Sequence, residues 1–133
     1  MSLKKLRNNP FQHFVGIEII KLGNGKSLLQ LDLKEHHLNL YGIPHGGVHA
    51  TFLDITMGTA ASFPDSTERE VDSVTLNLSV DYISPPKTKL LISKGQITKK
   101  GKSICYCSGE IYDDEKNLVA SGRSIFKLYD RKS

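Results

Sequence analysis

Apolar and polar residues alternate along six stretches of this chain, and a period of two is typical of strands that bury one face. The first two stretches, residues 15–22 and 27–34, are joined by Gly23-Asn24-Gly25-Lys26, a run that favours a tight turn, so they predict a β-hairpin. The other four stretches span residues 71–83, 90–98, 103–112 and 118–129. Short turns join the last three of them, which predicts antiparallel neighbours.

The alternation also predicts which side chains share a face of each strand. In residues 71–83 one face is apolar and carries Val74, Leu76, Leu78, Val80 and Tyr82. The opposite face is polar and carries Ser73, Thr75, Asn77, Ser79 and Asp81. In the last strand one face carries small side chains that would let a helix approach the sheet closely, in the run Ala120, Gly122, Ser124 and Phe126.

The segment from Gly46 to Phe63 breaks this alternation. It is mostly small and apolar, and its length of about 18 residues favours a helix over a strand. Small residues on nearly all sides predict a helix that is enclosed by other elements. A shorter helix is expected over residues 2–9, closed by Pro10.

Six strands and one long helix predict an α+β fold, in which an antiparallel sheet wraps a central helix. The chain has 133 residues and no visible repeat or linker, so a single domain over residues 1–133 is expected. The order of the strands does not follow from the periodicity.

Composition narrows the classes of partner. The formal charge is +4, and this mild basic excess suits a phosphate-bearing small molecule as well as a nucleic acid. No nucleic-acid-binding motif is visible, so nucleic acid is not expected as a partner. The chain has neither an apolar run long enough to span a membrane nor the apolar core of a secretion signal near its start, which predicts a cytoplasmic protein without membrane association.

Asp54 lies in the middle of the apolar helix, between Leu53 and Ile55. A buried carboxylate is costly unless it is paired or hydrogen-bonded. Two interpretations remain open for this residue. The side chain points to solvent from a half-exposed helix, or it serves as a base or a nucleophile.

His45-Gly46-Gly47 stands at the expected start of the same helix. Glycines there leave backbone N–H groups uncovered, and together with the helix dipole these groups favour a negatively charged oxygen. The two glycines could instead only shape a tight turn, with His45 as a cap or a packing residue. An N–H donor of this kind and a carboxylate are what hydrolysis of a thioester or an ester needs.

Gly46 and Asp54 are eight residues apart, which is about 12 Å along a helix axis. One carbonyl group cannot easily meet both of them. Two copies of the helix that pack antiparallel would bring the start of one near the middle of the other. If these residues cooperate, the spacing predicts a homodimer with two shared sites.

The run Asn39-Leu40-Tyr41-Gly42-Ile43-Pro44-His45-Gly46-Gly47, followed by Asp54, resembles the motif of hotdog-fold acyl-CoA thioesterases. The nearest branch is the phenylacetate-degradation (PaaI-like) type, which includes the mammalian thioesterase superfamily member 2 group. Further similarity extends over most of the chain, at Asn9-Pro10-Phe11, Val74 to Leu78, Tyr82-Ile83-Ser84-Pro85 and Gly122. The resemblance implies a hotdog fold, a long helix wrapped by a six-stranded antiparallel sheet, paired into homodimers and then homotetramers.

The resemblance also implies roles for four residues near the helix start and in the helix. Asp54 would be the nucleophile or the general base that activates water. Gly46 would donate its N–H to the thioester carbonyl from the other subunit. His45 would help to hold the thioester end, and Asn39 would orient the nucleophile or the lytic water.

Other residues are expected around the substrate. Thr75 falls where related enzymes carry a Ser or Thr near the attacking water. Gly47, at the helix start, is a candidate substrate contact. Four cations are candidate contacts for the phosphates of CoA, and they are Lys99, Lys100, Lys102 and Arg123. Lysine-rich turns also keep surfaces soluble, so these cations are candidates only. CoA is part of the substrate, and no separate cofactor is expected.

The histidines show no convincing metal pattern. His45 and His49 are four residues apart, which can place two ligands on one helix face, but no further ligand motif accompanies them. No metal site is expected.

The sequence therefore predicts an acyl-CoA thioesterase, which hydrolyses a CoA thioester to a free acid and CoA. The alternative is a non-catalytic hotdog module that binds acyl-CoA, although such a module would need no nucleophile. Dehydratase or hydratase chemistry on the same fold is a third interpretation, and the His-Gly-Gly motif is not typical of it. The acyl group is not predicted.

Overall fold

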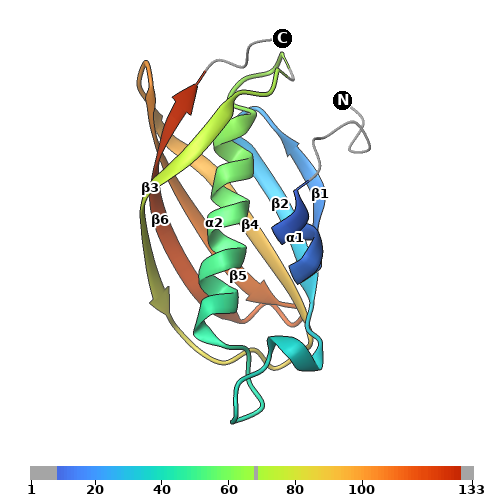
Figure 1. The fold of residues 1–133 in the computed structure, drawn as a ribbon. Helices are drawn as coiled ribbons and strands as arrows, with labels where there is room; N and C mark the ends of the chain where they lie inside the picture. The colour runs from blue at the N-terminus through green and yellow to red at the C-terminus, as the bar shows by residue number, and fades with distance from the viewer. Residues whose placement is uncertain (1–8, 68, 130–133) are drawn as a thin grey trace.

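The computed structural model describes residues 9–67 and 69–129. Its six strands form one antiparallel sheet in the order β1-β2-β4-β5-β6-β3. They are β1 (Ile17–Gly23), β2 (Lys26–Asp32), β3 (Asp72–Tyr82), β4 (Leu90–Lys100), β5 (Ile104–Asp113) and β6 (Leu118–Tyr129). Helix α2 (Gly46–Ser62) runs along the concave side of the sheet (Figure 1). The predicted α+β class and the hotdog arrangement, a long helix wrapped by six antiparallel strands, are confirmed.

The N-terminal prediction is wrong at residues 9 and 10, because Asn9 is not helical and Pro10 begins a helix. Helix α1 (Pro10–Val15) has Asn9 as its N-cap, and the Asn9 side chain accepts a hydrogen bond from the Gln12 amide at 3.2 Å. Proline suits the first helical position because its missing N–H would have no partner there in any case. Residues 2–8 of the expected helix lie outside the described residues.

Strand β3 departs from the predicted alternation because it contains a bulge. Its register against β6 shifts between Thr75 and Asn77, so Leu76 is the extra residue. A bulge changes which face the following side chains take. Thr75 therefore lies on the same side of the sheet as α2, together with Leu78, whereas Val74 is 52% exposed. The prediction that Thr75 belongs to the polar face opposite Leu78 is wrong for this reason.

A row of glycines sets the distance between α2 and the sheet. Gly95, Gly109 and Gly122 are direct neighbours across β4, β5 and β6. A Cβ added at Gly95 would lie 2.9 Å from the Thr56 carbonyl oxygen, and Cβ atoms at Gly109 and Gly122 would lie 3.1 and 3.3 Å from Met57 atoms. The helix backbone therefore approaches the sheet closely at Gly95, and the Met57 side chain fills the space that Gly109 and Gly122 leave open. Gly95 and Gly109 complete a row that the sequence pattern did not reveal.

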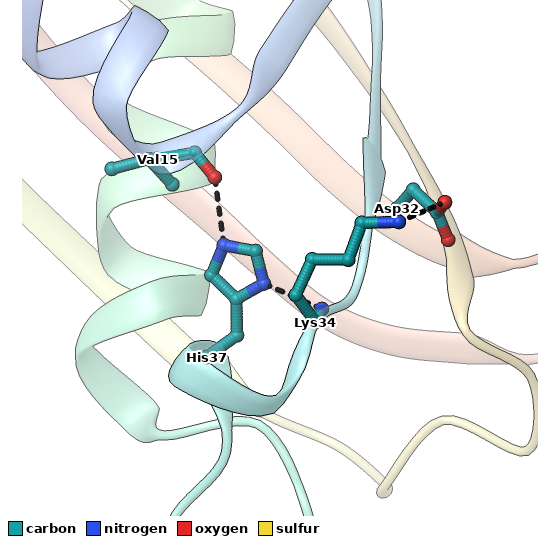
Figure 2. A network of polar contacts seen from close by, with 4 residues as sticks. All are labelled: Val15, Asp32, Lys34 and His37. Carbon is teal, nitrogen blue, oxygen red and sulfur yellow. Dashed lines mark hydrogen bonds and ion pairs between the residues drawn. The ribbon is translucent and has the colours of Figure 1, made fainter.

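His37 ties α1 to the segment that leads toward α2 (Figure 2). It lies in the 3₁₀ turn η2 (Glu35–His37) and is 3% exposed. The Lys34 amide donates to Nδ1 at 2.8 Å, so the ring proton sits on Nε2, which donates to the Val15 carbonyl oxygen at 2.7 Å. The exposed Lys34 ammonium pairs with Asp32 at 2.9 Å. These contacts fix the end of η2, from which the loop 38–45 continues to the helix start.

Asp113 joins the turn between β5 and β6 to the segment that leads into β4. Burial raises the pKa of this carboxyl group, but hydrogen bonds from the Lys87 amide and from Asn117 outweigh burial and lower the pKa to about 2. The Glu115 amide donates to the same carboxylate at 3.0 Å. Asp113 therefore fixes the backbone at Lys87, directly after Pro85 and Pro86, and these two prolines line one of the pockets described below.

We predict opposite effects for two Gly→Ala changes. Gly95→Ala should lower the free energy of unfolding by about 2 kcal/mol, because the new methyl group meets the backbone of α2. Gly58→Ala should raise it by up to about 1 kcal/mol, because alanine favours the helix and its Cβ makes an ordinary contact with Phe126 at 3.4 Å. Urea denaturation of both variants measures the difference. Equal effects would contradict the close approach at Gly95.

Asp113→Asn should destabilise the protein in a pH-dependent way. The folded-state pKa of Asp113 lies below its ordinary value, so its contribution to stability is complete above about pH 4 and is lost as the pH falls toward 2. The difference in free energy of unfolding between wild type and Asp113→Asn should therefore shrink over that range. Asp114→Asn, at an exposed neighbour, is the matched control. A difference that stays constant from pH 5 to pH 2 would show that the carboxylate charge is not the cause.

Candidate active site

The start of α2 leaves one backbone donor uncovered. His45 is the N-cap, with extended backbone at φ −61° and ψ 144°, and its Nδ1 accepts a long hydrogen bond from the Gly47 amide at 3.4 Å. The Val48 amide donates to the His45 carbonyl oxygen at 2.9 Å. Among the described residues, none accepts a hydrogen bond from the Gly46 amide. This N–H stands at the positive end of a 17-residue helix, where an oxygen with developing negative charge is stabilised.

Tyr82, at the end of β3, holds this helix start in place. Its hydroxyl donates to the Gly46 carbonyl oxygen at 2.7 Å. The peptide group between Gly46 and Gly47 is therefore bound at its oxygen by Tyr82 and at its N–H by His45. The sequence placed Tyr82 at the end of a strand and in a run that resembles the family, but nothing in its spacing pointed to a contact with Gly46.

Asn39 shapes the loop before the helix. Its side-chain oxygen accepts hydrogen bonds from the Tyr41 amide at 2.9 Å and the Ile43 amide at 3.3 Å. Its side-chain amide makes no hydrogen bond to another described residue. Asn39 and Gly46 both line a pocket of about 290 Å³. The amide of Asn39 is thus available beside the helix start.

Asp54 is half-buried in the middle of α2. The Thr75 hydroxyl donates to Oδ1 of Asp54 at 2.8 Å, across the gap between α2 and β3. This contact exists because the bulge at Leu76 turns Thr75 toward the helix. Asp54 and Thr75 line a second pocket, of about 610 Å³, which extends to α1 and β1. The second carboxylate oxygen of Asp54 has no hydrogen-bond partner within the part of the chain that the structure describes.

The single chain keeps these two groups of residues in separate pockets. Asn39 and Gly46 line the smaller pocket, and Asp54 and Thr75 line the larger one, with no residue shared between the two linings. Gly46 and Asp54 belong to the same continuous helix, so their separation of about 12 Å along the axis is fixed. The structure therefore does not bring the predicted N–H donor and the predicted carboxylate together within one chain.

The predicted phosphate contacts also lie away from the helix start. Lys99, Lys100 and Lys102 are exposed at the end of β4 and in the next turn, and Lys100 is close enough to Asp65 to lower its pKa slightly, after the larger effect of Thr67. Asp65 follows the C-terminal end of α2, so this lysine turn lies at the end opposite Gly46.

Arg123 is exposed on β6, between two residues that face α2, so it points to the opposite face of the sheet. Gly47 is exposed beside His45 at the helix start. Of the candidate substrate contacts, only Gly47 therefore lies near the Gly46 amide within one chain.

Two further findings concern metals and membranes. Within residues 9–67 and 69–129, no three His, Cys, Asp or Glu side chains gather closely enough to hold a metal ion. None of the helices in these ranges is long and apolar enough to cross a membrane.

Comparison with known proteins identifies the family. The model of the thioesterase superfamily matches residues 41–120. Human acyl-coenzyme A thioesterase 13 is 29% identical over 125 residues, which is 92% of this chain and 86% of the human protein. The match to the family model thus spans the helix start, Asp54 and Thr75.

Solved structures share the fold. A hypothetical thioesterase of Streptococcus pneumoniae, solved with coenzyme A, has a TM-score of 0.79 and 25% identity over 89% of each chain. The Escherichia coli PaaI protein of the phenylacetic acid degradation operon has a TM-score of 0.83 and 20% identity, covering 92% of this chain and 86% of that one, and shows the fold alone. The family model matches more than half of the chain. The chain therefore belongs to the thioesterase superfamily.

Proposed function

We propose that this protein is an acyl-CoA thioesterase, which hydrolyses a CoA thioester to a free acid and CoA. The observation that carries the proposal is the pair of complementary groups on α2. The Gly46 amide is an unused donor at a helix N-terminus, and Asp54 is a half-buried carboxylate anchored by Thr75 with one oxygen free. Family membership and the human relative, which is named an acyl-coenzyme A thioesterase, support the choice of substrate class.

The chemistry needs both groups at one carbonyl. The Gly46 N–H binds the thioester oxygen and stabilises the negative charge that develops on it during attack. Asp54 either takes a proton from the attacking water or attacks the carbonyl carbon itself and is then released by water. The C–S bond breaks, and CoA leaves as a thiolate that takes up a proton. His45 and the free amide of Asn39 border the carbonyl, and Thr75 fixes the orientation of Asp54.

Two chains complete each site in this proposal. Strand β3 is an edge of the sheet, and its exposed apolar residues include Val74 at 52% and Leu76 at 56% exposure. A long exposed edge strand favours pairing with another strand. Pairing of β3 with β3 of a second copy sets the two α2 helices antiparallel, which brings Gly46, His45 and Asn39 of one chain toward Asp54 and Thr75 of the other.

The same dimer gives the lysine turn a role. In antiparallel helices the C-terminal end of one lies beside the N-terminal end of the other. Lys99, Lys100 and Lys102 of one chain then approach the helix start of its partner, where they can contact the phosphates of CoA. Two such dimers would associate into a homotetramer. Arg123, on the outer face of the sheet, has no comparable path to the substrate in this arrangement.

Asp54→Asn should lower kcat for acyl-CoA hydrolysis by at least about 100-fold while the fold stays intact, because the amide neither removes a proton nor attacks the carbonyl. The measurement is thiol release over a series of aliphatic and aryl acyl-CoAs, with circular dichroism as the check on folding. Asp114→Asn, exposed and away from both pockets, should match wild type. Tight acyl-CoA binding by wild type with no thiol release would instead establish the binding module.

Subunit complementation tests the shared site. Gly46→Pro removes the N–H and adds a ring that the helix start can accept, because proline suits the first helical position and the extended backbone of His45 suits the residue before a proline. We expect Gly46→Pro and Asp54→Asn homodimers to be inactive, and their purified heterodimer to recover about half of wild-type activity, from one complete site of two.

Gly46→Ala is the control for this experiment. It keeps the N–H, and its Cβ would meet Tyr82 at an ordinary 3.5 Å, so it should stay active. An inactive heterodimer would contradict sites shared between chains, and an active Gly46→Pro homodimer would contradict the role of the N–H.

A further inference from the structure

The Gly46 amide stands between two anchored groups of the backbone. On its N-terminal side, the His45 amide donates to the His37 carbonyl oxygen at 2.9 Å. On its C-terminal side, the Gly46 carbonyl oxygen accepts a hydrogen bond from the Tyr82 hydroxyl at 2.7 Å. The direction of the Gly46 N–H therefore depends on both bonds, and the second of them comes from a side chain of the edge strand β3.

The first turn of α2 has little intrinsic stability with which to hold that direction by itself. Gly46 and Gly47 are its first two residues, and each glycine costs a helix about 1 kcal/mol relative to alanine. The His45 cap is weak, because the Gly47 amide lies 3.4 Å from its Nδ1, which is longer than an ordinary hydrogen bond. Helix ends of this kind fray unless another element holds them.

Tyr82 is placed to provide that restraint. Its backbone pairs with Ala120 of β6, so the residue belongs to the hydrogen-bonded ladder of the sheet. Its ring lies beside the ring of His49 on α2, with centroids 6.0 Å apart. The bond from its hydroxyl to Gly46 therefore ties the start of the helix to the sheet.

Packing alone does not explain a tyrosine at this position. The side chain is 55% exposed in the single chain, so its ring contributes less to the core than a buried aromatic residue would. Within the part of the chain that the structure describes, its hydroxyl makes no hydrogen bond other than the one to Gly46. A phenylalanine would keep the ring contacts and lose only that bond.

We propose that Tyr82 is a positioning residue for thioester hydrolysis, which holds the start of α2 so that the Gly46 N–H is aimed at the thioester oxygen before attack. The inference rests on the proposed function. A donor that is already oriented stabilises the developing charge without first having to be ordered, so its disorder slows the chemical step. Tyr82 acts through Gly46 of its own chain, whereas the carboxylate of the same site comes from the second chain.

Tyr82→Phe should lower kcat for acyl-CoA hydrolysis by about 10-fold and leave KM within about 2-fold of wild type, because the lost bond orders the donor and does not contact the substrate. Thiol release measures both constants. Tyr112→Phe is the matched control, since it also loses one hydroxyl hydrogen bond, to Glu110 at 3.0 Å, and Tyr112 lines neither pocket. It should match wild type.

The kinetic outcomes separate this inference from the proposed function. An unchanged kcat in Tyr82→Phe overturns the positioning role and leaves the thioesterase activity standing. A rise in KM at constant kcat would make Tyr82 a substrate contact, and it also overturns the positioning role. If wild type releases thiol from no acyl-CoA, both proposals fail.

Mixed dimers show which group Tyr82 acts through, once complementation of Gly46→Pro has shown that the sites are shared. In a heterodimer of Tyr82→Phe with Asp54→Asn, one site joins an intact helix start to an intact carboxylate, so about half of wild-type activity should remain. In a heterodimer of wild type with a chain that carries both substitutions, the remaining carboxylate faces the altered helix start, so about one-twentieth should remain. Equal activities or the reverse order would overturn an action through Gly46.

Amide hydrogen exchange gives a readout that needs no substrate. In Tyr82→Phe the Gly47 and Val48 amides should exchange about 10-fold faster than in wild type, because the first turn opens more often. The Leu53 amide, in the middle of α2, should keep its wild-type rate. Unchanged exchange at the helix start overturns the proposal. Faster exchange along the whole helix would show a general loss of stability, which overturns it as well.

Discussion

Helix α2 can approach the sheet closely only where the strands present no side chains. This constraint determines how the helix is placed and which of its residues face each strand. Gly95, Gly109 and Gly122 form that bare row, and Met57 and the Thr56 backbone fill the space above it. The Ser27 hydroxyl adds a hydrogen bond to the Thr56 carbonyl oxygen at 2.6 Å. With these positions of the helix pressed against the sheet, its rotation is fixed, and Asp54 is directed toward β3.

The edge strand β3 contributes to both pockets. Its bulge at Leu76 turns Thr75 onto Asp54, and its last residue, Tyr82, reaches the carbonyl of Gly46. One strand thereby positions the carboxylate in the middle of α2 and the N–H donor at the start of α2. Because β3 is also exposed at the sheet edge, a second copy that pairs with it would be held in register with both.

The rigidity of α2 is the reason that the proposed site needs two chains. A continuous helix holds Gly46 and Asp54 at a constant separation, so no loop movement within one chain can bring them to one carbonyl. The glycines at the helix start, the anchored carboxylate and the free edge strand are therefore parts of one arrangement.

The sequence by itself determined the local elements and the family. Alternation placed the six strands, the small apolar run placed α2, and the His-Gly-Gly motif with Asp54 identified the hotdog thioesterases, because each of these signals depends on residues that are near one another in the chain. The face of Thr75 was predicted wrongly, since a bulge depends on the register with β6 and leaves no mark on the alternation of its own strand. Pro10 was misplaced because proline can end a helix or begin one, and the Asn9 cap decided between them.

Only the tertiary structure decided the contacts between distant segments. The pairs Thr75–Asp54 and Tyr82–Gly46 join β3 to α2 across 21 and 36 residues, and the glycine row spans three strands. Hydrophobic periodicity records which face of an element is buried, and it does not record which atom on another element that face will meet.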